Sequence, residues 1–360
     1  MKLLMISGDR SILQGKKGAF WYTLEELSKH WERIDVICPR PAGVESGKWK
    51  EESVFSNVFF HPSSSGLWYQ PWWILSKGKE LIAEHHHDVM TVHEYPPFYN
   101  GLGARWLHGA TGISYALEVH HIETRAFSRF CIPWTARKAA AVRVVNGTVR
   151  KELSGWGIPE GKIRIVPSFY LDAEALRSDS SIPKQHDVVF CARLVRGKNI
   201  ATVLRTVSTL PDIRLLVIGD GPERSGSEAK AQRLGIAQRV TFTGWLPTRE
   251  DVFTAVQSAR VMVVASEEEG GPRSALEAMA LGIPVITTRV GVMNEVIQDG
   301  ANGIFTDGTV NDMAQKIAAL LENPAMQERI GAEAKKILGK FERKTLVKAY
   351  AEFLQSLCAC

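Results

Sequence analysis

The sequence predicts an α/β protein made of two doubly wound domains, each built on a parallel sheet and facing the other across a cleft. Apolar runs of four to seven residues, rich in β-branched side chains, alternate with segments of helical periodicity through most of the 360 residues. Continuous apolar runs of this kind are typical of strands buried on both faces. The polar stretch 171–186 interrupts the alternation and separates two strand–helix series. The length suits two domains of ordinary size.

The same pattern places the individual elements. Strands in the first half are expected at 3–6, 35–38, 58–61, 89–92, 113–119, 142–145 and 163–167. Strands in the second half are expected at 187–191, 214–218, 240–243, 261–265 and 284–287. Helices are expected at 23–30, 200–210, 249–257 and 274–281, and 310–357 predicts two or three more, with stops at Pro324 and Gly339. In parallel sheets of this kind, ligands bind beyond the carboxyl ends of the strands.

The composition is that of an ordinary globular protein, with 45% hydrophobic and 23% charged residues and a net charge of +5. It excludes disordered, collagen-like and disulfide-stapled chains. No apolar run approaches the roughly 20 residues of a membrane span, and the first residues do not resemble a signal peptide. Five scattered cysteines suit reduced thiols, and frayed terminal cysteines explain Cys358 and Cys360 better than a lipidation signal does. We therefore expect a cytoplasmic protein.

The first half is basic and the second half is neutral. Residues 1–170 contain 21 basic and 16 acidic side chains, whereas the remainder contains 23 of each. The stretch 124–151 has seven basic residues and no acidic one. The two halves should therefore meet different partners. Nucleic acid is not expected, because the basic residues come without a recognised nucleic-acid-binding module.

A group of aromatic residues followed by lysines lies in the first half. It consists of Trp68, Tyr69, Trp72, Trp73, Lys77 and Lys79. Aromatics beside lysines suit a membrane interface or a wall on which sugars stack, although packing in the core is an equal alternative. Together with the basic stretch, the group suggests that the N-terminal domain contacts an anionic membrane surface or a lipid-linked acceptor.

Basic and glycine-rich turns follow two strands of the second half. Arg193 and Lys198, separated by a glycine turn that leads into a helix, can converge on one anion. After the next strand, Gly219 belongs to the run IGDGP, where glycines let a ligand approach the backbone closely. Solvated basic residues and a plain tight turn are the alternatives for these two clusters. The glycine pattern of a dinucleotide site is absent.

An acidic loop and a further glycine turn follow the last strands. Glu267, Glu268 and Glu269 lead into Gly270-Gly271-Pro272, and Glu277 lies further along the next helix. Carboxylates at such a position can accept hydrogen bonds from polyol hydroxyls. An acidic first turn that complements the helix dipole would explain the three adjacent glutamates but not Glu277. The turn 291–295 begins with glycine and leads into a helix whose N-terminus could face phosphate.

Four segments in this order resemble the donor site of retaining glycosyltransferases of family 4, which have the GT-B fold. The segments are CARLVRGKNIATVL, LLVIGDGP, VTFTGWLP and EEEGGPRSALEAMALGIPVITTRVGVMNEVIQDGANGIF. The resemblance is clear over 185–310 and weak in the first half. It implies an acceptor-binding domain at 1–170, a linker at 171–186, a donor-binding domain at 187–340, and C-terminal helices at 341–360 that return toward the first domain.

The resemblance also implies roles for single residues. Arg193 and Lys198 would hold the donor diphosphate, Glu269 a hydroxyl of the transferred sugar, and Glu277 the ribose hydroxyls. The remaining donor-binding positions would be Gly219, Trp245, Leu246, Gly270, Gly271, Pro272 and Arg273. In the first half, ISYALEVHHIE matches the strand that ends in the active-site histidine, which makes His120 the match and His121 the reserve. Together with Arg193, Lys198 and Glu269, His120 would form the catalytic set.

Other positions match the family less well. His93, Lys17 and Gly18 fall at acceptor or loop positions, but Lys17-Gly18 stands where the family usually has paired glycines. Ser168-Phe169 replaces the usual Asn-Gly, which leaves acceptor and donor preference open. The run EGGP replaces the commoner aromatic residue or leucine after glycine, which leaves the specificity of the sugar pocket open.

The expected reaction is a retaining, metal-independent transfer of a sugar from a nucleotide-diphosphate sugar to a hydroxyl, on a lipid-linked or cell-surface glycan. No cofactor is expected, since the sequence lacks Asp-x-Asp. The three histidines 85–87 diverge on any regular element, so surface histidines are expected there rather than a metal site. A sugar-nucleotide epimerase on the same fold and a non-catalytic binding scaffold are the alternatives. The donor base and sugar, the acceptor and the linkage stay open.

Overall fold

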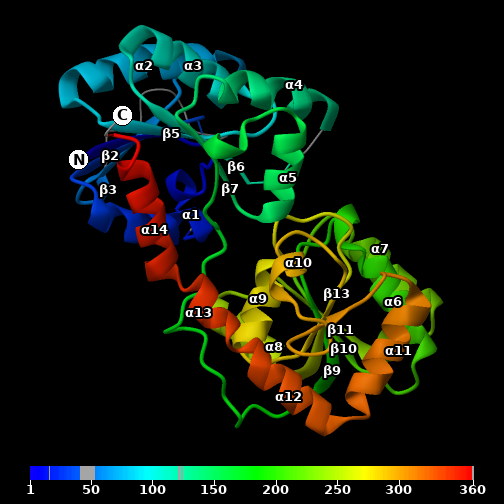
Figure 1. Ribbon diagram of the computed structural model, residues 1–360. Helices are drawn as coiled ribbons and strands as arrows, with labels where there is room; N and C mark the ends of the chain where they lie inside the picture. Colours follow the sequence, from blue (N-terminus) through cyan, green and yellow to red (C-terminus); the bar gives the residue numbers. More distant parts are fainter. Residues whose placement is uncertain (16, 41–52, 121, 123–124, 359–360) are drawn as a thin grey trace. The chain divides into compact units, whose positions relative to one another are not determined.

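The computed structural model describes residues 1–15, 17–40, 53–120, 122 and 125–358. The chain divides into two compact units (Figure 1). The first unit consists of Met1–Ser168 together with Arg343–Cys360, and the second consists of Phe169–Glu342. The stretch 171–186 lies within the second unit, and the C-terminal segment is part of the first.

The first unit is built on an eight-stranded sheet in the order β3-β4-β2-β1-β5-β6-β7-β8. Its strands are β1 (Lys2–Ile6), β2 (Arg33–Cys38), β3 (Ser53–Phe55), β4 (Val58–Pro62), β5 (Val89–His93), β6 (Tyr115–Val119), β7 (Ala141–Val144) and β8 (Ile163–Ile165). Strand β3 pairs antiparallel with β4 at one edge, and all other neighbours are parallel. The parallel central strands are buried along their length, as continuous apolar runs predict.

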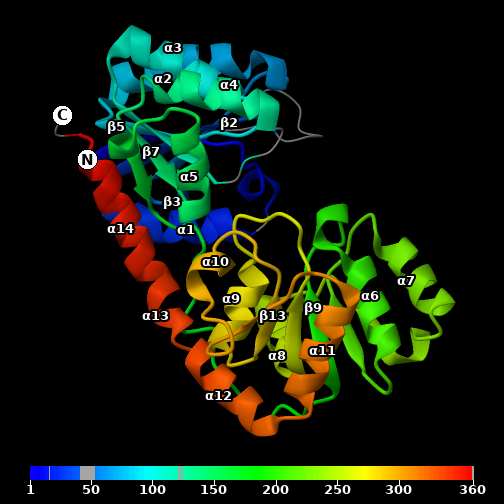
Figure 2. The same cartoon turned by 45° about the vertical axis from the view of Figure 1, so that its right-hand side comes forward.

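Helices cover both faces of this sheet. They are α1 (Ala19–Leu27), α2 (Gln70–His85), α3 (Tyr99–Thr111), α4 (Arg125–Ala136), α5 (Gly147–Gly155) and α14 (Arg343–Gln355). Helices α2, α3 and α4 lie over one face, and α1 and α14 lie over the other (Figures 1 and 2). The core beneath the first group includes Ile74, Leu107 and Leu117. Helix α14 packs on α1 and on β5, so residues from the end of the chain complete the first unit.

The second unit contains a six-stranded, wholly parallel sheet in the order β11-β10-β9-β12-β13-β14. Its strands are β9 (His186–Cys191), β10 (Leu215–Ile218), β11 (Val240–Gly244), β12 (Ala259–Val264), β13 (Val285–Thr287) and β14 (Ile304–Phe305). Its helices are α6 (Ile200–Thr209), α7 (Arg224–Arg233), α8 (Arg249–Gln257), α9 (Arg273–Ala280), α10 (Met293–Val296), α11 (Val310–Leu321), α12 (Pro324–Ala334) and α13 (Ile337–Phe341). The prediction of two doubly wound α/β domains is confirmed.

Helix boundaries in the second unit follow local capping chemistry. Thr248 and Asp251 form a reciprocal capping box that begins α8. Asn323 caps α12, and Pro324 occupies the first turn, where its missing N–H costs nothing. The break predicted at Pro324 lies between α11, which ends at Leu321, and α12, which begins at Pro324. The stop predicted at Gly339 is wrong, because Gly339 lies inside α13. Residues 310–357 form four helices, so the prediction of two or three was too low.

The strand order reverses at one point in each sheet. In the second unit, β10 lies on one side of β9 and β12 on the other. In the first unit, β2 and β5 flank β1 in the same way. At such a point the loops that leave the carboxyl ends diverge, which leaves room for a ligand. Groups that could bind a ligand therefore lie after β9 and β12 in the second unit and after β1 and β5 in the first.

A buried charge cluster corrects one expectation about the histidines. His87 is 8% exposed, and its Nε2 lies 2.8 Å from a carboxylate oxygen of Asp35. His61 lies 2.7 Å from the other oxygen, and Arg33 donates two hydrogen bonds to the same carboxylate. Although burial alone would raise it, these hydrogen bonds hold the pKa of Asp35 far below its usual range. His87 is thus part of the interior, where a surface histidine was expected.

No helix in the described part of the chain is both long enough and apolar enough to cross a membrane.

Candidate functional site

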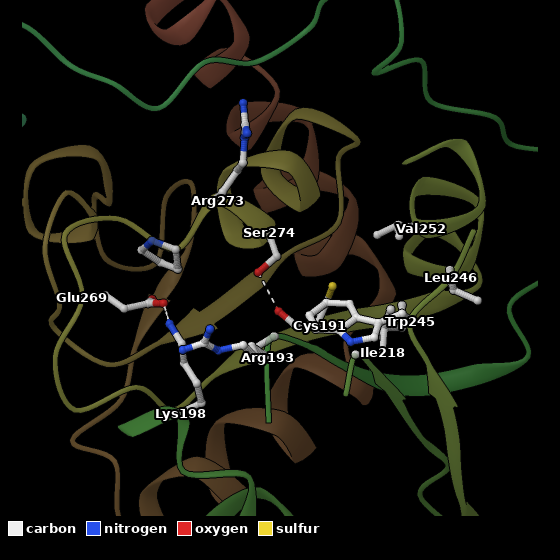
Figure 3. A pocket seen from close by; sticks show the side chains of 13 residues that line it. Cys191, Arg193, Lys198, Ile218, Trp245, Leu246, Val252, Glu269, Arg273 and Ser274 are labelled. Carbon is white, nitrogen blue, oxygen red and sulfur yellow. Dashed lines mark hydrogen bonds and ion pairs between the residues drawn. The ribbon is translucent and has the colours of Figure 1, made fainter. Parts of the chain in front are cut away.

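A pocket of about 290 Å³ opens at the carboxyl ends of the strands in the second unit (Figure 3). Its walls come from the turns after β9, β10 and β11 and from the loop that joins β12 to α9. Of the predicted donor-site residues, eight line it. They are Arg193, Lys198, Gly219, Trp245, Leu246, Glu269, Pro272 and Arg273. The pocket therefore lies at the point where the strand order reverses.

Arg193 and Lys198 both come from the turn after β9. Lys198 ends a short 3-10 turn, and Asn199, with φ of 59°, starts α6 directly afterwards. The ammonium of Lys198 forms an ion pair with Glu269 (Figure 3). Burial lowers the pKa of Lys198, and the nearby charge of Arg193 lowers it further. The two cations therefore repel each other, and an anionic ligand that contacts both would offset this repulsion.

Glu269 lies on the loop between β12 and α9, with a side chain only 14% exposed. One carboxylate oxygen, Oε1, takes part in the ion pair with Lys198. The other, Oε2, is buried and has no hydrogen-bond partner among the described residues. A buried carboxylate oxygen without a donor is unfavourable. The position therefore suits an oxygen that receives a hydroxyl hydrogen from a ligand.

The turn 291–295 supports the acidic loop through the backbone. Gly291 has φ of 45°, and a Cβ at this position would lie 2.2 Å from the carbonyl oxygen of Gly270 and 2.3 Å from that of Glu269. The amide of Val292 donates a hydrogen bond of 3.0 Å to the same Gly270 oxygen. In the structure, this turn thus holds the Glu269–Gly270 backbone in place.

Three predicted donor residues lie beside the pocket rather than in its lining. Glu277 on α9 forms ion pairs with Arg273 at 3.6 Å and Arg249 at 3.8 Å. Burial raises the pKa of Glu277, and the two guanidinium charges act against that rise. Gly270 carries the backbone contacts described above. Gly271 lies under the ring of Phe169, which is 2.7 Å from the position of a Cβ.

Several pocket residues were given no role from the sequence, although all of them except Val252 lie in the segments that resemble the family. Cys191, Ala192, Ile218, Val252 and Ser274 also line the pocket. Ser274 donates a hydrogen bond of 2.7 Å to the carbonyl of Cys191, which joins α9 to the end of β9. Burial raises the pKa of the Cys191 thiol to about 12, so this thiol is protonated at neutral pH. The exposed indole of Trp245, by contrast, was expected at the pocket.

In the first unit, His120 and His93 meet beside a buried carboxylate. Their rings are 5.5 Å apart. Nε2 of His120 lies 3.1 Å and Nε2 of His93 lies 3.5 Å from Glu118, which is fully buried in β6. Nδ1 of His93 lies 3.3 Å from the hydroxyl of Ser7, which directly follows β1. These side chains converge where β1 and β5 adjoin.

The other first-unit positions are more scattered. Lys17 lies over the ring of Trp21 at 4.8 Å, and Gly18 is the residue before α1. His121 lies outside the described residues. Among the described residues, no group of three or more His, Cys, Asp or Glu side chains is arranged to hold a metal ion.

Comparison with known families identifies a domain in each half of the chain. Residues 172–337 match the sequence model described as "Glycosyl transferases group 1". Residues 20–170 match the model described as "Glycosyltransferase Family 4". The two matched ranges adjoin near the division between the two units.

Curated relatives are similar over part of their length. The lipopolysaccharide core biosynthesis glycosyltransferase LpsE of Rhizobium meliloti is 29% identical over 208 residues, which are 56% of this chain and 59% of that protein. D-inositol 3-phosphate glycosyltransferase of Mycobacterium sp. (strain KMS) is 37% identical over 161 residues, 42% of this chain and 36% of that protein. The chain thus spans between about a third and three fifths of these relatives.

Solved structures share the fold over nearly the whole chain. Sucrose-phosphate synthase from Thermosynechococcus elongatus aligns with a TM-score of 0.85 at 18% identity, covering 99% of both chains. HepE from Anabaena, solved with UDP-glucose, aligns with a TM-score of 0.77 at 19% identity, covering 99% of this chain and all of that one. With the two matched domains, these alignments confirm the predicted GT-B fold.

The backbone packing of Gly291 predicts a selective effect of adding one methyl group. Gly291→Ala should lower the free energy of unfolding by about 2 to 4 kcal/mol, because it combines a left-handed conformation with a collision against the acidic loop. Gly300 is a matched control, since it also has positive φ (73°) but no atom of a described residue within 4 Å of its Cβ position. Gly300→Ala should cost only about 1 kcal/mol. Denaturant unfolding measures both; equal losses would contradict the packing argument.

Proposed function

The chain carries a glycosyltransferase domain in each half, and from this we propose that it is a retaining, metal-independent transferase. It moves a sugar from a nucleotide-diphosphate sugar to a hydroxyl of an acceptor glycan. The observation that carries the proposal is the grouping of two cations and one carboxylate around a single pocket. Arg193 and Lys198 suit a diphosphate, and Glu269 suits a sugar hydroxyl.

The ion pair between Lys198 and Glu269 gives donor binding a defined first step. A diphosphate carries more negative charge than one carboxylate and would draw the ammonium to itself. Glu269 would then exchange the ammonium for a sugar hydroxyl. Donor binding in this proposal thus rearranges a charge pair that is already present.

The reaction then follows from where charge develops. As the anomeric bond breaks, the sugar gains positive charge and the leaving diphosphate gains negative charge. Arg193 and Lys198 stabilise that negative charge from positions set before the reaction, which makes a metal ion unnecessary. Departing and attacking oxygens lie on the same face of the sugar in a retaining transfer, so the leaving phosphate can accept the acceptor's proton.

Trp245, Leu246 and Glu277 complete the proposed donor site. The exposed Trp245 indole, next to Leu246 at the pocket, offers a flat surface for the base. Glu277 would receive the ribose hydroxyls by exchanging one of its two arginine partners, both more than 3.5 Å away. HepE, which shares the fold, has been solved in complex with UDP and with UDP-glucose, and we therefore choose UDP-glucose as the first donor to test.

We expect release of nucleoside diphosphate from UDP-glucose or another nucleotide sugar, undiminished by EDTA, with the anomeric configuration retained.

Glu269→Gln should lower turnover at least about 100-fold, as loss of one stabilising group in a catalytic site does, while UDP binding persists. Glu267→Gln makes the same change two residues away, on an exposed side chain bonded to Asn199. It should retain activity. Isomerised donor instead of transfer would indicate an epimerase, and binding without turnover a scaffold.

The lowered pKa of Lys198 predicts a pH dependence of donor binding. The charged ammonium form of Lys198 binds the diphosphate, so the affinity for UDP should fall as the pH rises through the pKa of Lys198. Because that pKa is lowered, the fall should begin below the pH at which an exposed lysine titrates. Lys198→Arg keeps its charge in this range and should bind UDP evenly up to pH 10. Calorimetric titration across pH 7 to 10 compares the two. Parallel curves would show that Lys198 does not meet the phosphates.

For the acceptor, we propose a lipid-linked or cell-surface glycan reached at an anionic membrane. Five of the large apolar side chains that are exposed in the described residues come from the segment just before α2, from α2 itself and from α4, two helices over the same face of the first sheet. They are Leu67, Trp68, Trp72, Phe127 and Phe130. Trp72 contacts Trp106 at a ring distance of 5.4 Å, and Phe127 stacks on Phe98, so the group extends across α2, α3 and α4.

Basic residues accompany these aromatics. Lys79 is exposed one heptad after Trp72 on α2, and Arg129, Arg137 and Lys138 are exposed in or just after α4. Aromatics that enter the headgroup region beside cations that attract anionic lipid are the arrangement of interfacial helices. LpsE, a lipopolysaccharide core enzyme by its name, supports the choice of acceptor class.

Co-sedimentation with vesicles tests the membrane proposal. The chain should bind phosphatidylcholine vesicles that contain phosphatidylglycerol, less at high salt, and pure phosphatidylcholine weakly. A Trp68→Ser, Trp72→Ser double variant should lose most of this binding. Trp245→Ser, which removes an equally exposed tryptophan from the second unit, should keep it. Equal binding of all variants, or binding indifferent to salt, would overturn the proposal.

A further inference from the structure

The carboxylate behind the histidine pair is surrounded by donors from several elements. Glu118 is 0% exposed, in the middle of the first sheet. Arg143 on β7 donates to it at 2.6 Å, and the hydroxyls of Thr91 on β5 and Tyr350 on α14 also donate to it. Burial alone would raise the pKa of Glu118, but the charges of Arg143 and His93 and the histidine hydrogen bonds hold it well below its usual range. The group is therefore an anion at neutral pH.

The arginine in this network cannot turn away from the carboxylate. Its Nε and Nη2 donate hydrogen bonds of 3.0 Å to the carbonyls of Val166 and Pro167, just after β8. Its guanidinium lies 3.8 Å from the ring centre of Tyr350. Arg143 is thus held by β8 and α14 while it neutralises Glu118. The rear of the carboxylate is closed.

Of the described side chains that contact Glu118, the two histidines are the ones that reach solvent. The side chains of His120 and His93 are 37% and 20% exposed, whereas those of Glu118 and Arg143 are 0% and 2% exposed. The carboxylate thus stands behind two accessible imidazoles. When a carboxylate accepts a hydrogen bond from the N–H of a neutral imidazole, the other ring nitrogen is left as a hydrogen-bond acceptor. The carboxylate thereby sets the tautomer of the ring.

We propose that Glu118, held by Arg143 and by Tyr350 of the C-terminal helix, is the positioning residue for the active-site histidine. It keeps Nε2 of His120 as the donor and Nδ1 as the acceptor that meets the substrate. The inference rests on the proposed function and on the active-site role that the family resemblance implies for His120. The tautomer and the proton affinity of the ring are properties of the free protein and can be measured without substrate.

The charged groups around His120 determine whether loss of the Glu118 charge raises or lowers the pKa of His120. The ring faces His93 on β5, Glu118 on β6 and Arg143 on β7. Its half-buried position lowers the pKa of His120, Arg143 and His93 lower it further, and Glu118 opposes them. Loss of the Glu118 charge should therefore lower the pKa of His120 further. A group that served only to fill space would not have this effect.

The first test is an NMR titration of the histidine rings in the full chain, with the His120 signal assigned by its loss in His120→Gln. Glu118→Gln should lower the pKa of His120 by about one unit or more, the effect of removing an opposite charge in contact. Its Nε2 should also lose the N–H donor signature. A folded Glu118→Gln protein with an unchanged His120 pKa would overturn the proposal.

A second variant keeps the charge and removes only the contact from α14. Tyr350→Phe keeps the ring beside Arg143 and deletes one hydrogen-bond donor to Glu118. The Glu118 carboxylate then accepts more strongly from its remaining donors, so the pKa of His120 should rise by a few tenths of a unit. Tyr115→Phe is the matched control, since Tyr115 is equally buried in the same sheet but donates to the carbonyl of Thr135. It should leave the pKa unchanged. If Glu118→Gln does not fold, an equal result for the two tyrosine variants overturns the proposal.

The kinetic readout separates this inference from the proposed function. In a protein that turns over donor, the acid limb of the kcat/KM profile in Glu118→Gln should move to lower pH, together with the pKa measured by NMR. Absence of turnover in the wild-type chain would contradict the proposed function and leave the titration result standing. Turnover with identical acid limbs in wild type and Glu118→Gln would contradict the positioning role.

Discussion

Parallel strands impose the constraint on which both candidate sites depend. All strands in such a sheet end at one edge, and the loops that leave them diverge where the strand order reverses. In the second unit this brings Lys198, after β9, to Glu269, after β12. In the first unit it brings Ser7, after β1, to His93, at the end of β5. Residues far apart in sequence thus meet because the strands that carry them are neighbours.

The two units neutralise their buried charges in different ways. Lys198 and Glu269 satisfy each other through one contact, and one oxygen of Glu269 stays without a partner among the described residues. That pair can be exchanged for a ligand. Glu118, in contrast, is enclosed by groups from several elements, and removal of any one would leave a buried charge less satisfied. The first arrangement suits binding, and the second suits the permanent orientation of its neighbours.

The sequence predicts the sheets well because buried parallel strands are continuous apolar runs. It predicts the pocket because Arg193, Lys198 and Glu269 lie in the turns and loops that follow such runs. It misses the two-residue β14 and the edge strand β3, since short strands carry almost no periodic signal. It also misses the burial of His87, whose partner Asp35 lies 52 residues away. Glu118 and Tyr350 are missed for the same reason: neither carries a local pattern, and only the packing of α14 on the first sheet brings them together.

The assignment of α14 to the first unit has a consequence for how the protein is made. Tyr350 follows Glu118 by 232 residues. A ribosome that adds about 5 to 20 residues per second needs roughly 10 to 50 s to cover that length. During this interval the whole second unit emerges, while the carboxylate of Glu118 lacks one of its donors and the face of the sheet under α14 lacks its cover. The unit that is translated first is therefore completed last.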